Sequence, residues 1–153
     1  MADVTIHGGV ALRNYLTKIA HQFNQVKGKT LRVGFLPSAP HYPRTGLPTA
    51  YIASVQEWGD PSHNIPARPF FRTTVKERQK EWPKIAKESL KSNGNDVEQT
   101  FNDIGAVIVG DIQASILGGS WAPNAPSTIR RKGRNWPLVD TFQMAHSVSY
   151  EIK

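Results

Sequence analysis

The chain has 153 residues, of which 39% are hydrophobic and 20% charged, a composition that indicates one folded domain and excludes wholesale disorder. It contains no cysteine, which excludes disulfides, thiol catalysis and cysteine-ligated metals and fits folding in a reducing cytosol. We recognise no signal peptide and no apolar run long enough to cross a bilayer. The net charge of +7 favours a polyanionic partner such as DNA, although a basic surface also suits an acidic neighbouring protein.

The first third of the chain predicts a helix, a strand and a long loop. Apolar residues at helical spacing predict a helix over Val10–Val26, whose apolar face we expect to pack in the core rather than on a membrane. Alternating residues predict a half-buried strand over Leu31–Leu36. Four prolines exclude a helix from 37–48, which we expect to be either an arm or hairpin reaching a neighbouring subunit or a mobile surface loop. The apolar face of the helix comprises Leu12, Leu16, Ile19, Phe23 and Val26.

The middle of the chain predicts further helices. We expect Thr49 to cap a short helix that ends near Trp58. A longer helix is predicted after Pro69, kinked or broken by Pro83 and ended by the Asn-Gly-Asn sequence at 93–95.

Another long helix is predicted to begin at a cap, Asn95 or Asp96, and to end at Gly118. Gly105 and Gly110 lie inside it, and each costs about 1 kcal/mol relative to alanine. Glycine lets another backbone approach closely, so we expect this helix to pack tightly on a sheet.

The last part of the chain predicts an irregular passage at 120–137, a helical turn and a strand. Asp140 and Thr141 are expected to cap a short turn that ends at Met144. Alternation over Val148–Ile152 predicts a C-terminal strand. The predicted fold class is therefore α+β, with three or four helices packed on a small, mostly antiparallel sheet and a long proline-rich loop, all in one domain over 1–153.

No motif for catalysis, metal binding or cofactor binding is recognised, so we expect a protein that is not an enzyme and has no cofactor. The five histidines are not at metal-ligand spacing. The Gly-Gly-Ser-Trp sequence at 118–121 lacks the nucleophile-elbow pattern, and no phosphate-binding loop is present. Asp103 and Asp111 share a helix without a basic or nucleophilic partner nearby in sequence. The histidines are His7, His21, His41, His63 and His146.

One dense basic cluster, followed by Trp136, has the charge and aromatic content of a nucleic-acid contact. No helix-turn-helix or ribonucleoprotein-type motif accompanies it, so we favour a subunit interface paired with acidic groups and keep DNA contact as the alternative. Any contact with DNA would be to the backbone, without sequence readout. The candidate DNA-contact residues are Arg130, Arg131, Lys132 and Arg134.

The stretch from Glu57 to Phe71 is stiff, apolar and non-helical, because it carries three prolines together with large apolar side chains. For Trp58 and Phe71 we favour burial in a corner between helices. Arg68 and Phe70 fit a protein–protein interface better, since arginine and aromatic residues are enriched there.

Two sets of residues carry a resemblance to a known family. The first is Trp58-Gly59-Asp60-Pro61 with Ile65-Pro66-Ala67-Arg68-Pro69-Phe70, which resembles the pattern E-[FWY]-G-x-P … I-P-x-R-P-F. The second runs from Pro123-Asn124 through Thr128-Ile129 and Lys132-Gly133 to Pro137-Leu138-Val139-Asp140-Thr141 and Ser147-Val148-Ser149-Tyr150. Both resemble phage neck and tail-completion proteins, the group that includes the HK97-type neck protein, the minor tail protein Z of lambda-like phages and virion-morphogenesis proteins. One departure is Phe142, where the pattern has glycine; a phenylalanine disfavours the left-handed backbone, so we expect a different turn there.

The resemblance implies a structural virion protein at the head–tail junction of a tailed phage, made in the host cytoplasm and supporting tail attachment and DNA passage. It implies a homo-oligomeric ring, commonly six-fold, with other neck, connector and tail proteins as partners, and no membrane. Rings need heterologous contacts, for which the segments at 37–48 and 120–137 are candidates. A small basic DNA-binding module is the alternative function. The expected interface residues are Tyr42, Arg44, Trp58, Ile65, Arg68, Phe70, Trp121 and Trp136.

Overall fold

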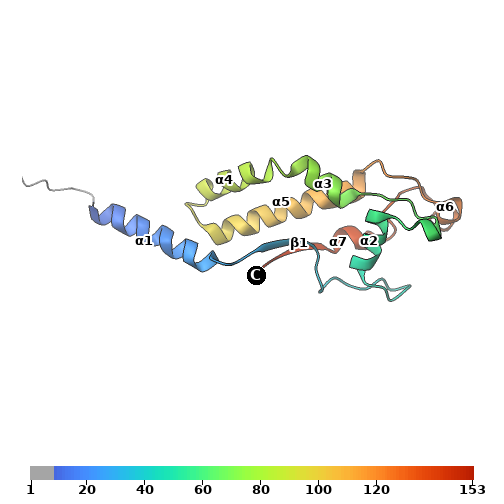
Figure 1. The fold of residues 1–153 in the computed structure, drawn as a ribbon, viewed down its shortest axis with the longest axis horizontal. Helices are drawn as coiled ribbons and strands as arrows, with labels where there is room; N and C mark the ends of the chain where they lie inside the picture. The colour runs from blue at the N-terminus through green and yellow to red at the C-terminus, as the bar shows by residue number, and fades with distance from the viewer. Residues whose placement is uncertain (1–8) are drawn as a thin grey trace, which may run out of the picture.

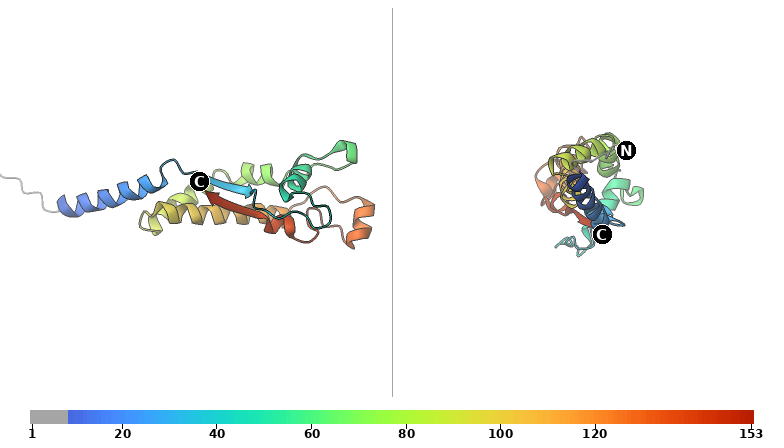
Figure 2. Two further views of the ribbon diagram at one scale, coloured as in Figure 1. Left: turned by 90° about the horizontal axis from the view of Figure 1, so that it is seen from below. Right: turned by 90° about the vertical axis from the view of Figure 1, so that its left-hand side faces the viewer.

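The computed structural model describes residues 9–153 and has one long central helix, α5 (Val97–Gly118), against which most of the other elements lie. Helices α3 and α4 cover one side of α5, and a two-stranded sheet covers the other (Figures 1 and 2). The remaining elements are α1 (Gly9–Val26), β1 (Leu31–Phe35), α2 (Thr49–Trp58), the 3-10 helix η1 (Pro61–His63), α3 (Phe70–Arg78), α4 (Trp82–Ser92), α6 (Pro126–Lys132), α7 (Gln143–His146) and β2 (Val148–Ile152).

The sheet joins the two predicted strands in antiparallel register, with Val33 opposite Tyr150 and Phe35 opposite Val148. The predicted α+β class is therefore confirmed, although the described residues form more helices than the three or four expected. Two separate bridges, His41 with Pro48 and Asp60 with Ile65, close the proline-rich loop and the turn around η1.

The core lies where α2, α3, α5, α7 and β2 meet. Phe70 and Ile112 are at most 1% exposed, and the Phe70 ring packs edge-on against Phe35 with the centroids 6.2 Å apart. Burying side chains of this size stabilises the fold by about 1.5–3 kcal/mol each. The buried apolar cluster comprises Ala53, Phe70, Ile112, Ile116, Met144, Ala145 and Val148.

The two glycines of α5 have different roles. A Cβ at Gly105 would lie 2.6 Å from Cδ2 of Tyr150, so the predicted close approach between helix and sheet is confirmed at this residue. The Tyr150 ring cannot easily move away, because its hydroxyl is within 3.2 Å of Asn102 Oδ1. At Gly110 nothing lies within 4 Å of the added atom, so close approach does not explain this glycine.

Pro83 ends the predicted long helix instead of kinking it. The chain forms α3 and then α4, with Pro83 in the first turn of α4, where its missing N–H costs nothing. Asp111 of α5 joins the two helices, since its Oδ2 accepts from Arg78 Nε at 3.2 Å and from Trp82 Nε1 at 2.8 Å. Asp111 thus has a basic partner that its sequence neighbourhood did not reveal.

Three helix-cap predictions have different outcomes. Asp96 caps α5 by accepting from the backbone N–H of Gln99, as expected. Thr49 does not cap α2, because its hydroxyl donates instead to the carbonyl of Pro40 across the loop. Asp140 and Thr141 do not cap α7; Phe142 is its N-cap, with φ of 62°. The left-handed backbone expected only of glycine is therefore present at Phe142, held by edge-on packing on Trp136.

Two larger expectations are wrong. The basic cluster is not in irregular structure, because Arg130, Arg131 and Lys132 form the last turn of α6. Helix α1 begins at Gly9, one residue before its predicted start, and ends at Val26 as predicted. It projects from the body (Figure 1), and Leu16 of its apolar face is 55% exposed. Val10 and Tyr15 are also more than half exposed, so these side chains do not enter the core of one copy. Among residues 9–153, no helix has the length and apolar character that crossing a membrane requires.

Gly105→Ala is predicted to destabilise the protein by about 1–3 kcal/mol, because the added methyl overlaps the Tyr150 ring. Gly110→Ala is the matched control on the same helix, and it should stabilise the protein by roughly 0.5–1 kcal/mol. Urea denaturation measures both free energies of unfolding. Equal effects of the two substitutions would contradict the contact between α5 and β2.

Hydrogen bonds from Ser89, Asn93 and Gln99 lower the pKa of Asp103, and those from Ser89 and Asn93 connect the end of α4 to α5. A carboxyl with a lowered folded-state pKa stabilises the protein above its unfolded pKa, and this contribution is lost as the pH falls through the folded value. We therefore predict that the urea midpoint of Asp103→Asn falls less steeply between about pH 5 and about pH 2 than that of the unmodified protein. Parallel pH profiles would contradict a role for this charge.

Candidate functional site: a cationic cleft

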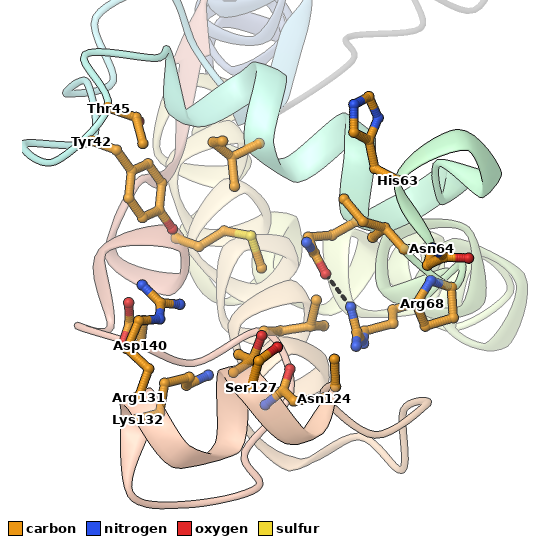
Figure 3. Close-up of a pocket in the computed structure, with 18 of the residues that line it drawn as sticks. Tyr42, Thr45, His63, Asn64, Arg68, Asn124, Ser127, Arg131, Lys132 and Asp140 are labelled. Atoms are coloured by element: carbon orange, nitrogen blue, oxygen red, sulfur yellow. Dashed lines mark hydrogen bonds between the residues drawn. The ribbon is translucent and has the colours of Figure 1, made fainter.

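A cleft of about 590 Å³ opens between α2, the loop after β1 and α6. Figure 3 shows Arg131, Lys132 and Asp140 at one end, Arg68 and Asn64 at the other, and Asn124 between them. Its volume is in the range of small-molecule and peptide-side-chain sites. The apolar part of the lining comes from Ile52, Ile65, Pro66, Leu138 and Met144.

Arg68 is held by oxygens of three residues that are distant in sequence. Its Nε donates to the carbonyl of Ala122 at 2.8 Å and its Nη2 to the carbonyl of Pro123 at 2.9 Å. Its Nη1 donates to Gln56 Oε1, the bond drawn in Figure 3. Pro66 and Pro69 flank Ala67-Arg68 and hold this segment extended, so the Arg68 side chain points toward the segment after α5. Arg68 thereby fastens α2 and the segment 120–125 together.

The Arg68 guanidinium has no carboxylate partner within residues 9–153, although it is only 4% exposed. Three of its five N–H groups donate to neutral oxygens, which satisfy hydrogen bonding without neutralising the charge. Burial of the cation lowers its pKa, as expected for a charge removed from water. A buried cation without an anion is unusual, because isolated buried charges are costly.

The opposite end of the cleft contains its only lining carboxylate, Asp140. Burial lowers the pKa of Lys132, Asp140 partly opposes this effect, and the positive charges of Arg134, Arg131 and Arg68 add to it. Lys132 Nζ donates to the carbonyl of Trp136 at 2.7 Å, which keeps its stem against α6. The Lys132 end is therefore partly neutralised, while the Arg68 end is not.

Asn124 adds an unused donor to the lining. Its backbone N–H bonds to Asn135 Oδ1 at 3.0 Å, but its buried Nδ2 finds no acceptor within the described chain. Arg44 and Arg131 also line the cleft, and neither makes an ion pair with a carboxylate of residues 9–153. The basic side chains around this cavity thus outnumber its one carboxylate.

The burial of three residues around α2 is the reverse of the expectation, while Phe71 is half-buried and packs against the core. Trp58 is 63% exposed, whereas Phe70 is 1% exposed and belongs to the core. Phe70 and Arg68 are therefore not on the free surface of one copy. The reason is the buried Glu57 carboxylate, which accepts from the backbone N–H groups of Phe71 and Arg72 and so caps α3.

The same carboxylate orders the outer surface. Its Oε1 lies 2.8 Å from Arg72 Nε, and the Arg72 guanidinium lies 3.9 Å above the Trp58 ring. Trp58 is thus held in a fixed orientation on the surface, and of the large apolar side chains outside α1 it is the most exposed in the part of the chain that the structure describes.

The two remaining tryptophans of the predicted interface serve the fold. Trp121 Nε1 donates to the carbonyl of Ser115 at 2.9 Å, and Trp136 Nε1 donates to that of Leu117 at 3.0 Å. Both indoles close the C-terminal end of α5, where carbonyls lack helical partners.

Of the predicted DNA-contact residues, Arg134 donates to the Asp140 carbonyl, while Arg130 is exposed and outside the cleft.

Asp60, Ser62 and His63 approach one another but lack the geometry of a catalytic triad. Ser62 Oγ and Asp60 Oδ2 both meet the same ring nitrogen, His63 Nδ1, at 3.1 and 2.6 Å. A triad needs one partner on each nitrogen, so that a proton can pass between them. The cluster forms the turn of η1. No group of three or more potential metal ligands occurs within 9–153, and His7 lies outside the described residues.

The structure brings Tyr42, Arg44, Ile65 and Arg68 together with Arg131 and Lys132, which the sequence analysis assigned to separate interface and DNA-contact sets. It adds Gln56, for which no sequence signal existed, Asn124, which belongs to the second resembling segment, and Asp140, which the sequence predicted to be a helix cap. Proline on both sides of the Ala-Arg dipeptide was the available signal that Arg68 is held in place.

The chain matches no protein-family model, no curated protein and no solved structure.

Arg68→Met is predicted to lower the free energy of unfolding by about 1–3 kcal/mol, because it leaves the carbonyls of Ala122 and Pro123 without donors. Arg131→Met is the matched control, which should change the free energy by less than about 0.5 kcal/mol because Arg131 is exposed. Urea denaturation at neutral pH measures both. An Arg68→Met protein as stable as the unmodified chain would show that the guanidinium does not hold these segments together.

Proposed function

We propose that the protein is a structural subunit of the head–tail junction of a tailed phage, which forms a ring with other copies of itself. The proposal rests on the resemblance to neck and tail-completion proteins. One observation carries it furthest. The two resembling segments, which are separated by more than fifty residues, meet through the bonds from Arg68 to Ala122 and Pro123.

Exposed apolar side chains on α1 support assembly from several copies. Val10 is 67% exposed and Leu16 is 55% exposed, on a helix that extends beyond the body (Figure 2). A helix with an apolar stripe is stabilised by burying that stripe, which a neighbouring copy would do. Trp58 offers a second exposed aromatic anchor on the body, and such anchors are enriched at interfaces.

The alternative, a small DNA-binding module, has less support in the contacts. Lys132 and Arg134 donate to carbonyls of their own chain, so only Arg130 and Arg131 of the basic cluster present side chains without hydrogen bonds in the described residues. Two phosphate contacts would give a weak affinity with only a shallow dependence on salt. Weak contact with DNA is also compatible with a ring around a DNA channel.

Light scattering of the purified protein at two salt concentrations, with and without duplex DNA, tests the proposal. We expect a discrete multimer whose mass does not depend on DNA. A monomer that binds DNA tightly at low salt and releases it at high salt would favour the DNA-binding module instead.

Leu16→Asp is predicted to convert the multimer to monomers, because it places a charge in the apolar contact of α1. Asn14→Asp adds the same charge to an exposed residue of the same helix and should leave the mass unchanged. Circular dichroism checks that both variants keep their helix content. If both variants assemble equally well, α1 does not form the contact between copies.

A further inference from the structure

We propose that the cationic cleft binds an acidic segment of another protein, with one carboxylate seated on Arg68. The inference goes beyond the proposed function and does not depend on ring formation, since every residue of the cleft comes from one copy. The first reason is the missing anion. Arg68 is 4% exposed and bonds only neutral oxygens, so it has the charge and remaining N–H groups to bind a carboxylate.

The other donors of the cleft are arranged for the same kind of ligand. The buried Nδ2 of Asn124 has no acceptor in the described chain, and the asparagine lies between the two charged ends in Figure 3. Arg44 and Arg131 line the same cavity without carboxylate partners, and Asp140 opposes only the Lys132 end. The cleft therefore has an excess of positive charge that the fold does not neutralise.

The shape and lining favour a peptide over duplex DNA. Phosphates of a duplex lie on a rigid convex surface, so they would meet the exposed Arg131 and would not reach the recessed Arg68. A glutamate or aspartate side chain is flexible enough to enter. Ile52, Leu138 and Met144 add apolar lining, which suits a segment that carries an apolar side chain among its acidic ones.

Helix α1 of a second copy does not have the required chemistry. Residues 9–26 contain no aspartate or glutamate, and they carry two basic residues, Arg13 and Lys18. The charge of the cleft suits an acidic segment of a different protein, which is the occupant we propose.

The probe is a fluorescently labelled peptide, acetyl-Glu-Glu-Leu-Glu-Glu-amide, titrated with the whole chain by fluorescence anisotropy at low and moderate salt. The same peptide with glutamine in place of glutamate is the ligand control. We expect binding of the acidic peptide only, weakened by salt as screening reduces the attraction. Equal binding of the glutamine peptide would overturn the proposal.

Two variants on α6 separate the cleft from general surface charge. Arg131→Glu should lower the affinity for the acidic peptide at least about tenfold, because it reverses a charge that lines the cleft. Arg130→Glu makes the same change at the adjacent exposed residue outside the cleft and should weaken binding about twofold or less. Equal losses would mean that the peptide binds a diffuse basic surface, and would overturn the proposal.

Gln56→Glu tests Arg68 without removing it. The substitution is isosteric and gives Arg68 the carboxylate it lacks, at an atom that already accepts from Nη1. We expect a raised melting temperature together with a loss of peptide affinity of about tenfold or more. A more stable protein that binds the peptide unchanged would leave Arg68 with a structural role only and overturn the proposal. If duplex DNA displaces the peptide, and if Arg131→Glu weakens DNA binding as much as it weakens peptide binding, the ligand is a nucleic acid instead.

Discussion

One buried cation, the Arg68 guanidinium, connects the parts of this protein that would otherwise be separate. The bonds from Arg68 to Gln56, Ala122 and Pro123 hold the segment from Glu57 to Phe71 against the segment after α5. Because these acceptors are neutral, the positive charge is oriented but not neutralised. The requirement to fix two irregular segments thus leaves an anion-accepting group at the base of a cleft.

The sequence predicted the elements whose patterns are local. The period of α5, the alternation of β1 and β2 and the stop at 93–95 depend on neighbouring residues only, and these elements appear with nearly the predicted bounds. Gly105 indicated the packing of helix on sheet correctly, because a glycine inside a helix needs a compensating contact. The same reasoning failed at Gly110, where no neighbour approaches.

The exposure of side chains around α2 could not be predicted, because it depends on a distant contact. Glu57 is buried as the cap of α3, which turns Phe70 inward and leaves Trp58 outside beneath Arg72. Nothing in the Glu-Trp-Gly sequence shows that the carboxylate is the buried member. Helix α6 was missed for a related reason: its seven residues begin at a proline and end in three charged ones, so they show no apolar period. The cleft joins segments from both halves of the chain, and therefore only the folded structure reveals it.

Two parts of the surface lack a partner within the residues that the structure describes. Val10, Tyr15 and Leu16 of α1 are exposed to water, and Arg68 in the cleft has no carboxylate partner within residues 9–153. Helix α1 and helix α6, which lines the cleft, lie at opposite ends of the molecule (Figure 1), and α1 has no acidic residue that could enter the cleft. A contact made by α1 would therefore leave the cleft free, so the proposed self-association and the proposed acidic partner do not exclude each other. Two distinct, non-overlapping surfaces are what a subunit needs to hold a heterologous assembly together while attaching it to something else.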